Sequence, residues 1–257
     1  VRAVAGFDAT FSAPKSLSAW WALTGDDGLA RCHDVAVHAV ANYLERFGAT
    51  TRVRSGDGRL HLDTQGLMMA AFRQTTSRLD DPQLHTHLVI SAKVQTEAGR
   101  WLALDARLLK QHQRTLGGLY QSVLRAELTH RYGVTFGEIV NGQAEIAGVP
   151  TALIERFSKR AAEVETQLAD QVAEFREREG RSPSQFEHAA LERQASEDTR
   201  RRKTGHPVTD LRRRWLGEAA ELGVTPQALS RSVGDAAKIA ASGSSVPAAS
   251  SGKPAIR

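Results

Sequence analysis

The sequence predicts an α+β fold, with a central antiparallel sheet of about five strands flanked by helices and followed by a helical extension. Residues 50–104 contain short segments with a two-residue hydrophobic period, separated by turn sequences such as SGDG. Segments with a helical period lie on both sides of this region, at about 14–47 and 106–133. Beyond Pro150 the helical period predominates, which predicts the extension.

The first half opens with a half-buried strand over residues 3–12, in which Asp8 lies on the less apolar side. Pro14 suits the first turn of a helix that Ser12 could cap, and a second helix over about 27–47 ends at Gly48. The strands that follow are TTRVR, LHLDTQ, GLMMAAFRQTTS, LHTHLVISAKVQT and WLALD.

Helices resume near Ala106, and VTFGEIVNGQAEIAGV returns to strand character with Asn-Gly as its turn. After Pro150, apolar residues at three- and four-residue steps predict one amphipathic helix from Leu153 to Phe175. Further helices are expected from Ser182-Pro183, Thr209 and Thr225-Pro226. We therefore divide the chain into a core at 1–150, a helical extension at 151–235, and a low-complexity linker or disordered tail at 236–257.

The composition fits a soluble globular protein with a slight basic excess. The 257 residues carry a net charge of +5, mostly through arginine, which suits phosphate recognition. A single cysteine, Cys32, excludes an internal disulfide and a zinc ribbon. Neither a long apolar run nor a leader-like start is seen, so we expect a cytoplasmic protein without a membrane segment.

Two histidines, His85 and His87, stand one residue apart in a predicted strand. Residues two apart project from the same face of a strand, and two neutral imidazoles placed so can share a divalent metal. Pairing of the preceding strand could bring the carbonyl oxygen of Gln74 beside them. Two nitrogens and one oxygen suit Mg²⁺ or Mn²⁺ bound to a phosphate oxygen. Hydrogen-bonded histidines and a solvated glutamine are the alternative.

Three segments carry a family resemblance: GFDATFSAPKSLSAWWAL, FRQTTSRLDDPQLHTHLVISAKV and RTLGGLYQSVLRAEL. Their order and content resemble the relaxase domain of the TrwC/TraI type, the conjugative relaxases of the HUH endonuclease superfamily. The resemblance covers residues 3–150 and continues more loosely through the helical part. It implies metal-dependent, strand-specific nicking of DNA by tyrosine transesterification.

The resemblance also assigns roles by position. The paired metal histidines of the family fall on His85 and His87, and its third histidine falls on Gln74, which favours Mg²⁺ or Mn²⁺ over Zn²⁺ or Ni²⁺. The aspartate of the family near its nucleophile falls on Asp8, which would orient a metal histidine or help to take the tyrosine proton. The family's nucleophilic tyrosine lies upstream of GFD, so we expect either a fragment without its nucleophile or a truncated parent protein.

Single-stranded DNA at a transfer origin is the implied partner, and a helicase module downstream in the parent chain is the expected neighbour. The candidates for DNA contact near the site are Lys15, Arg73 and Arg78, with solvated charges as the alternative. A basic run, DTRRRKTGH, lies in the helical part. Two other functions stay open: a catalytically inactive module that binds single-stranded DNA, and an unrelated two-histidine metal hydrolase.

Overall fold

The computed structural model describes residues 4–202 and 205–243. Its main sheet has three antiparallel strands in the order β1 (Gly6–Ser12), β5 (Pro82–Ser91) and β4 (Met69–Thr76). The α+β class is confirmed, whereas the expected five-stranded sheet is smaller. The remaining strands form two separate hairpins: β2 (Thr50–Ser55) with β3 (Gly58–Asp63), and β6 (Lys93–Gln95) with β7 (Trp101–Ala103).

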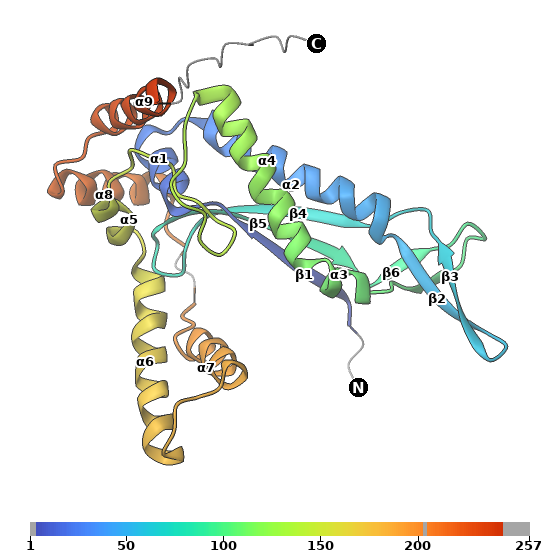
Figure 1. Cartoon of the computed structure of the whole chain (residues 1–257). Coiled ribbons are helices and arrows are strands. Elements are labelled where there is room, and N and C mark those ends of the chain that lie inside the picture. The colour runs from blue at the N-terminus through green and yellow to red at the C-terminus, as the bar shows by residue number, and fades with distance from the viewer. Residues whose placement is uncertain (1–3, 203–204, 244–257) are drawn as a thin grey trace, which may run out of the picture.

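The strand number differs because the two hairpins are bridged to each other at isolated points and do not belong to the ladder of the main sheet. An isolated bridge links Thr51 to Leu104, and another links Thr64 to Thr96. The β2–β3 hairpin extends away from the body as a ribbon (Figure 1). The predicted strand after Gly133 is likewise reduced to isolated bridges, such as that between Phe136 and Ile146.

The main sheet has one covered face and one open face, and the alternation along β5 decides which residues lie on each. Leu84, Leu88 and Ile90 are buried, on the face covered by α2 (Asp27–Gly48) and α4 (Gln113–Tyr132). Val89 and Phe72, on the opposite face, are 38% and 56% exposed. Because strand side chains alternate, His85 and His87 share the open face with them.

The other helices are α1 (Lys15–Thr24), α3 (Arg107–Gln111), α5 (Thr151–Arg156), α6 (Lys159–Glu179), α7 (Gln185–Asp198), α8 (Val208–Glu221) and α9 (Pro226–Gly243). The single helix expected from Leu153 to Phe175 is broken at Ser158 into α5 and α6. The reason is tertiary: Leu153 and Phe157 belong to the main core, whereas Phe175 packs in the hairpin of α6 and α7.

Figure 1 shows α6 and α7 as an arm that projects from the body. We call this hairpin, residues 159–198, the arm. By contrast, α5, α8 and α9 pack on α1, and Trp215 is fully buried in the same cluster as Phe11 and Leu84. Helix α9 runs to Gly243, into the stretch expected to be a linker. The rest of that expected tail, 244–257, lies outside the described residues. No described helix has the length and apolar character to cross a membrane.

Candidate functional site

The two histidine rings lie side by side on the open face of the sheet. Their ring centroids are 5.3 Å apart, with the ring planes inclined by 71°. On the neighbouring strand β4, Gln74 is the register partner of His85 and Phe72 that of His87. Directly opposed residues of antiparallel strands share a face. The structure thus places Gln74 next to the rings, as the sequence pattern predicts.

Each ring is held through Nδ1. Nδ1 of His87 donates to the carboxylate of Asp8, whose two oxygens lie 2.9 and 3.0 Å away. The hydroxyl of Thr10 lies 3.1 Å from the same nitrogen. Nδ1 of His85 donates to the backbone carbonyl of Gln83 at 2.9 Å. With the proton on Nδ1, the lone pair of a neutral imidazole sits on Nε2, which is the form that binds a metal.

A metal at this place would need a third donor from a residue other than His, Cys, Asp or Glu. Within residues 4–202 and 205–243, no group of three or more His, Cys, Asp and Glu side chains is placed to hold a metal. The two imidazoles and the amide of Gln74 form the alternative set. It mixes nitrogen and oxygen donors, which suits a hard or borderline divalent ion.

The rings open into a cleft of about 630 Å³ between the sheet and the arm. We call it the histidine cleft. Its residues are Thr10, Ser12, Thr76, Ser77, Arg78, Gln83, His85, His87, Arg160, Arg193, Ser196, Glu197 and Arg200. Four guanidinium groups therefore surround one small space, with Glu197 as the single lining carboxylate. Burial, and then the like charges of Arg200 and Arg160, lower the pKa of Arg78.

The structure separates the three residues expected to contact DNA. Arg78 lines the histidine cleft, and its guanidinium also donates to the backbone carbonyl of Arg201 at 2.8 Å. Arg73 points to the covered face, where it forms an ion pair with Asp34 of α2. Being one residue from Gln74, it has to point the opposite way.

Lys15 is likewise outside the cleft. Its ammonium donates to the carbonyl of Pro82 at 3.0 Å, and burial lowers its pKa to about 8. The neighbouring Asp81 is fully buried. Lys15 therefore holds the start of β5, and it is not among the residues that line the cleft.

Sequence reasoning missed Arg160 and Arg193, while the basic run DTRRRKTGH already contained Arg200. Arg160 also ties the arm together, because it donates to the carbonyls of Ser196 and Thr199 at 2.7 and 2.8 Å. No local pattern marks either arginine, since both reach the histidines only through the packing of the arm.

A second missed element lies directly behind the histidines. Thr86, between them in sequence, points to the covered face and bonds to Nε2 of His33 at 2.8 Å. The other nitrogen of His33 bonds to the hydroxyl of Tyr120 at 2.6 Å. His33 is fully buried, and this burial lowers its pKa to about 4. The hydrogen-bonded set of Tyr120, His33 and Thr86 fixes the middle of β5 on the covered face of the sheet.

None of the three tyrosines lines the histidine cleft. Their hydroxyls are bonded elsewhere: Tyr43 to His112, Tyr120 to His33 and Tyr132 to Asp26. Burial is the main cause that raises the pKa of Tyr120 and of Tyr132. These phenols are placed for packing and hydrogen bonding, not for attack on a phosphate at the histidines.

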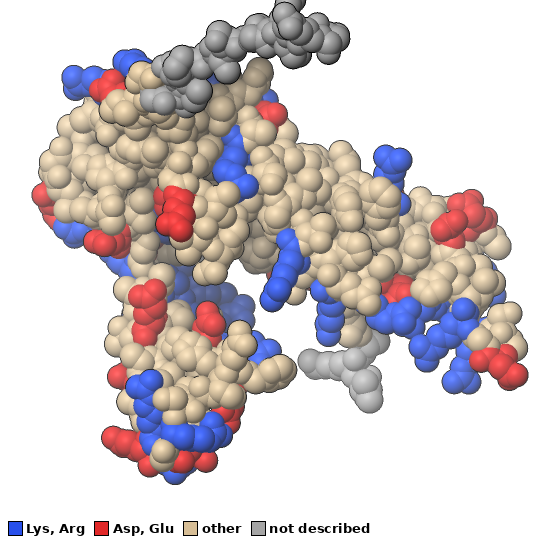
Figure 2. All heavy atoms as spheres, viewed as in Figure 1, with Lys and Arg blue, Asp and Glu red and all other residues tan. Residues whose placement is uncertain are grey.

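A second basic surface lies on the β2–β3 ribbon. Figure 2 shows Lys and Arg side chains gathered at this end of the molecule, beside acidic residues. Arg52 is neutralised by the buried Asp105 at 2.9 Å. Arg54 and Arg59, however, are direct cross-strand partners. Like charges placed so repel each other, and a bound polyanion would relieve that repulsion.

The chain is similar to known proteins along most of its length. The family model described as TrwC relaxase matches residues 1–222. The multifunctional conjugation protein TraI of Escherichia coli is 36% identical over 167 residues, and that of strain K12 is 35% identical over the same length. Each match covers 61% of this chain and 9% of the relative. The chain thus matches about a tenth of the length of these relatives.

Two solved structures are similar along most of the chain. The conjugative relaxase TrwC in complex with a mutant OriT DNA superposes with a TM-score of 0.69, at 32% identity, over 86% of this chain and 75% of that one. A metal-bound structure of TrwC with OriT DNA superposes with a TM-score of 0.68, at 32% identity, and the match covers 86% of this chain and 73% of that one. From the match over residues 1–222 and these similarities, the chain belongs to the TrwC relaxase family.

Proposed function

We propose that this chain is the DNA-processing domain of a conjugative relaxase, which nicks one strand of a transfer origin by tyrosine transesterification. One observation carries the proposal. Two imidazoles, each anchored through Nδ1, share an open sheet face with Gln74 beneath a cradle of four guanidinium groups. Such a site suits a phosphodiester with a divalent cation.

His85, His87 and Gln74 are the residues that would hold the metal. Their donors favour Mg²⁺ or Mn²⁺, with Zn²⁺ and Ni²⁺ as the alternatives. A bound divalent ion neutralises the charge that develops on the non-bridging phosphate oxygens. Asp8 keeps the proton on Nδ1 of His87, which presents Nε2 to the ligand side. Outer partners of this type orient metal-binding histidines.

The guanidinium groups of Arg78, Arg160, Arg193 and Arg200 would bind the phosphates of single-stranded DNA. Arginine matches phosphate geometry, and mutual repulsion among these groups makes a polyanion a stabilising occupant. Held between sheet and arm, the strand keeps one phosphate at the histidines, in a fixed orientation for in-line attack. The major groove of a duplex admits a two-stranded β-ribbon, and Arg54 and Arg59 of the β2–β3 ribbon would contact phosphates there.

The attacking group is a tyrosine oxygen. It forms a bond to phosphorus while the bond from phosphorus to the 3′ oxygen of the preceding nucleotide breaks, which leaves a 5′-phosphotyrosyl link and a free 3′-hydroxyl. Because Tyr43, Tyr120 and Tyr132 are engaged elsewhere, we place the nucleophile outside these 257 residues. The helicase module expected in the parent chain stays a prediction.

The test uses the full-length gene product, a single-stranded oligonucleotide of the transfer origin, and Mg²⁺. We expect a covalent protein–DNA adduct that survives denaturation, and its loss in the variant His85→Ala plus His87→Ala. The alternative, an inactive module that binds single-stranded DNA, predicts tight binding and no adduct under the same conditions. A two-histidine hydrolase predicts a cut strand with no protein attached.

A further inference from the structure

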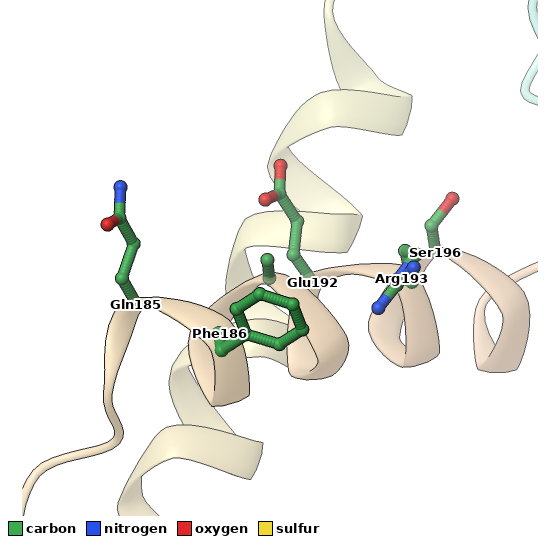
Figure 3. Close-up of a pocket in the computed structure, with 6 residues that line it drawn as sticks. Gln185, Phe186, Glu192, Arg193 and Ser196 are labelled. Atoms are coloured by element: carbon green, nitrogen blue, oxygen red, sulfur yellow. The ribbon is translucent and has the colours of Figure 1, made fainter. Parts of the chain in front are cut away.

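The arm carries a second groove that the proposed cleavage site does not use. Gln185, Phe186, Ala189, Glu192, Arg193 and Ser196 line it along one side of α7 (Figure 3). Arg193 and Ser196 also line the histidine cleft. The groove therefore adjoins the cleft at these two residues and follows α7 from there back to its start at Gln185.

Phe186 stands near the start of α7 with its ring in solvent. It is 88% exposed, the highest value among the exposed large apolar side chains of the described residues. In that part of the chain no ring and no guanidinium stacks on it, whereas Arg178 and Arg181 stack on the neighbouring Phe175. A single exposed aromatic is ordinary on a surface. What distinguishes Phe186 is its place in a groove that continues into a phosphate cradle.

The side chains along the groove favour DNA phosphates at one position and a DNA base at another. Phe186 and Arg193 are seven residues apart, so they lie on the same side of the helix. Gln185, Glu192 and Ser196 form the neighbouring row and point the same way (Figure 3). The carboxylate of Glu192 repels phosphate, whereas Arg193 attracts it. A strand leaving the cleft would thus keep its phosphates near Arg193 and meet Phe186 through a base.

The spacing suits a subsite a few nucleotides from the cut. Ser196, at the cleft, and Phe186 are ten residues apart, which is about 15 Å along a helix. Proteins that hold single strands combine a basic groove with aromatic rings on which bases stack, and every base offers a π-face. We propose that Phe186 is a stacking platform for an unpaired base of the DNA strand whose phosphate lies at His85 and His87. The proposal rests on the proposed function.

The test separates base contacts from phosphate contacts. The 257-residue chain and its Phe186→Ala variant are titrated with an oligothymidylate of about 12 nucleotides, a length within known single-strand site sizes, and with an abasic oligomer of equal length. We expect the variant to bind oligothymidylate about tenfold more weakly and the abasic oligomer as the parent does. Phe186→Trp should restore binding, because it keeps an aromatic face.

Phe47→Ala is the matched control, since Phe47 is 53% exposed on α2, outside both grooves. This control variant should bind both oligothymidylate and the abasic oligomer as the parent does. Equal affinities of the Phe186→Ala variant and the parent for oligothymidylate would overturn the stacking role while leaving the proposed function intact. An equal loss for both oligomers would also overturn it, because the effect would then not depend on a base. Failure of the unmodified chain to bind either oligomer would overturn the phosphate cradle on which the stacking role depends, whereas the proposed function is tested separately by the adduct with an origin oligonucleotide.

Discussion

The carboxylate of Asp8 on β1 reaches across the strand pair to Nδ1 of His87 on β5, at 2.9 Å. The two residues are 79 positions apart in sequence and nearly adjacent in register, since Asp8 pairs with Val89 and Thr10 with His87. This contact fixes the ring's orientation and tautomer from the side opposite to Nε2.

Removal of this contact should weaken metal binding without unfolding the chain. For Asp8→Ala we expect Mn²⁺ affinity to fall about 10- to 100-fold, because the ring of His87 loses its orienting partner. Calorimetric titration with Mn²⁺ measures this. Asp34→Ala, on the covered face, is the control and should bind Mn²⁺ as the unmodified chain does. Unchanged heats in the Asp8 variant would contradict the positioning role.

Gln74 should set the metal preference. Replacing it by histidine exchanges an oxygen donor for a third imidazole, so Gln74→His should bind Zn²⁺ and Ni²⁺ more tightly relative to Mn²⁺. Competition titrations among the three ions give the ratio. If the ratio stays that of the unmodified chain, the amide does not belong to the donor set. The double variant His85→Ala plus His87→Ala should abolish the heat of Mn²⁺ binding altogether.

His33 should make folding stability depend on pH. Its pKa is lowered by burial from 6.5 to about 4, so the unfolded chain takes up a proton more readily than the folded one. The contribution of neutral His33 to the free energy of unfolding is fully present above pH 6.5 and is lost as the pH falls from 6.5 to 4. This contribution amounts to about 3 kcal/mol. Urea denaturation between pH 7 and pH 4 measures it, and His33→Gln should flatten this part of the profile.

Lys159 should matter for stability far more than an exposed lysine. Its ammonium lies 3.1 Å from the buried carboxylate of Asp81 and 2.6 Å from Glu218. The Asp81 oxygens lack a well-aligned hydrogen bond, so this contact is chiefly ionic, and burial raises the pKa of Asp81. Lys159→Met should cost about 3 kcal/mol, because it leaves a buried charge uncompensated.

Lys238→Met is the control for that substitution, since Lys238 forms an exposed pair with Asp235 and should change stability by less than about 0.5 kcal/mol. Adding Asp81→Asn to Lys159→Met should restore most of the lost stability. Equal urea midpoints for the Lys159 variant and the unmodified chain would show that the ion pair contributes nothing.

The 257-residue chain alone should form no covalent adduct with single-stranded DNA. All three phenols are hydrogen-bonded away from the histidine cleft, and burial raises the pKa of two of them. Denaturing gel electrophoresis after incubation with Mg²⁺ and an origin oligonucleotide tests this. A shifted band would make one of Tyr43, Tyr120 and Tyr132 the nucleophile, and substitution of each by phenylalanine would identify it.

The sequence by itself determined the α+β class, the strand that carries the histidines, and the face that the two rings share. These follow from the helical and strand periods, which are local properties. That Gln74 lies on the same face depends on the register of β4 against β5, which is a contact between two segments. The strand period also separates Arg73 from Gln74, although closeness in sequence suggested a shared site. Short-range patterns place residues along an element and say little about which elements meet.

Only the tertiary structure decided what surrounds the histidines. Arg160 and Arg193 line the histidine cleft from a helical arm more than 70 residues away in sequence. Lys15 donates to the carbonyl of Pro82 instead of lining the cleft, and His33 supports β5 through its hydrogen bond to Thr86. The break at Ser158 divides the predicted long helix, and the arm that begins there faces the sheet across the histidine cleft. Such contacts depend on long-range burial and charge pairing, which act between segments and leave no periodic trace in either one.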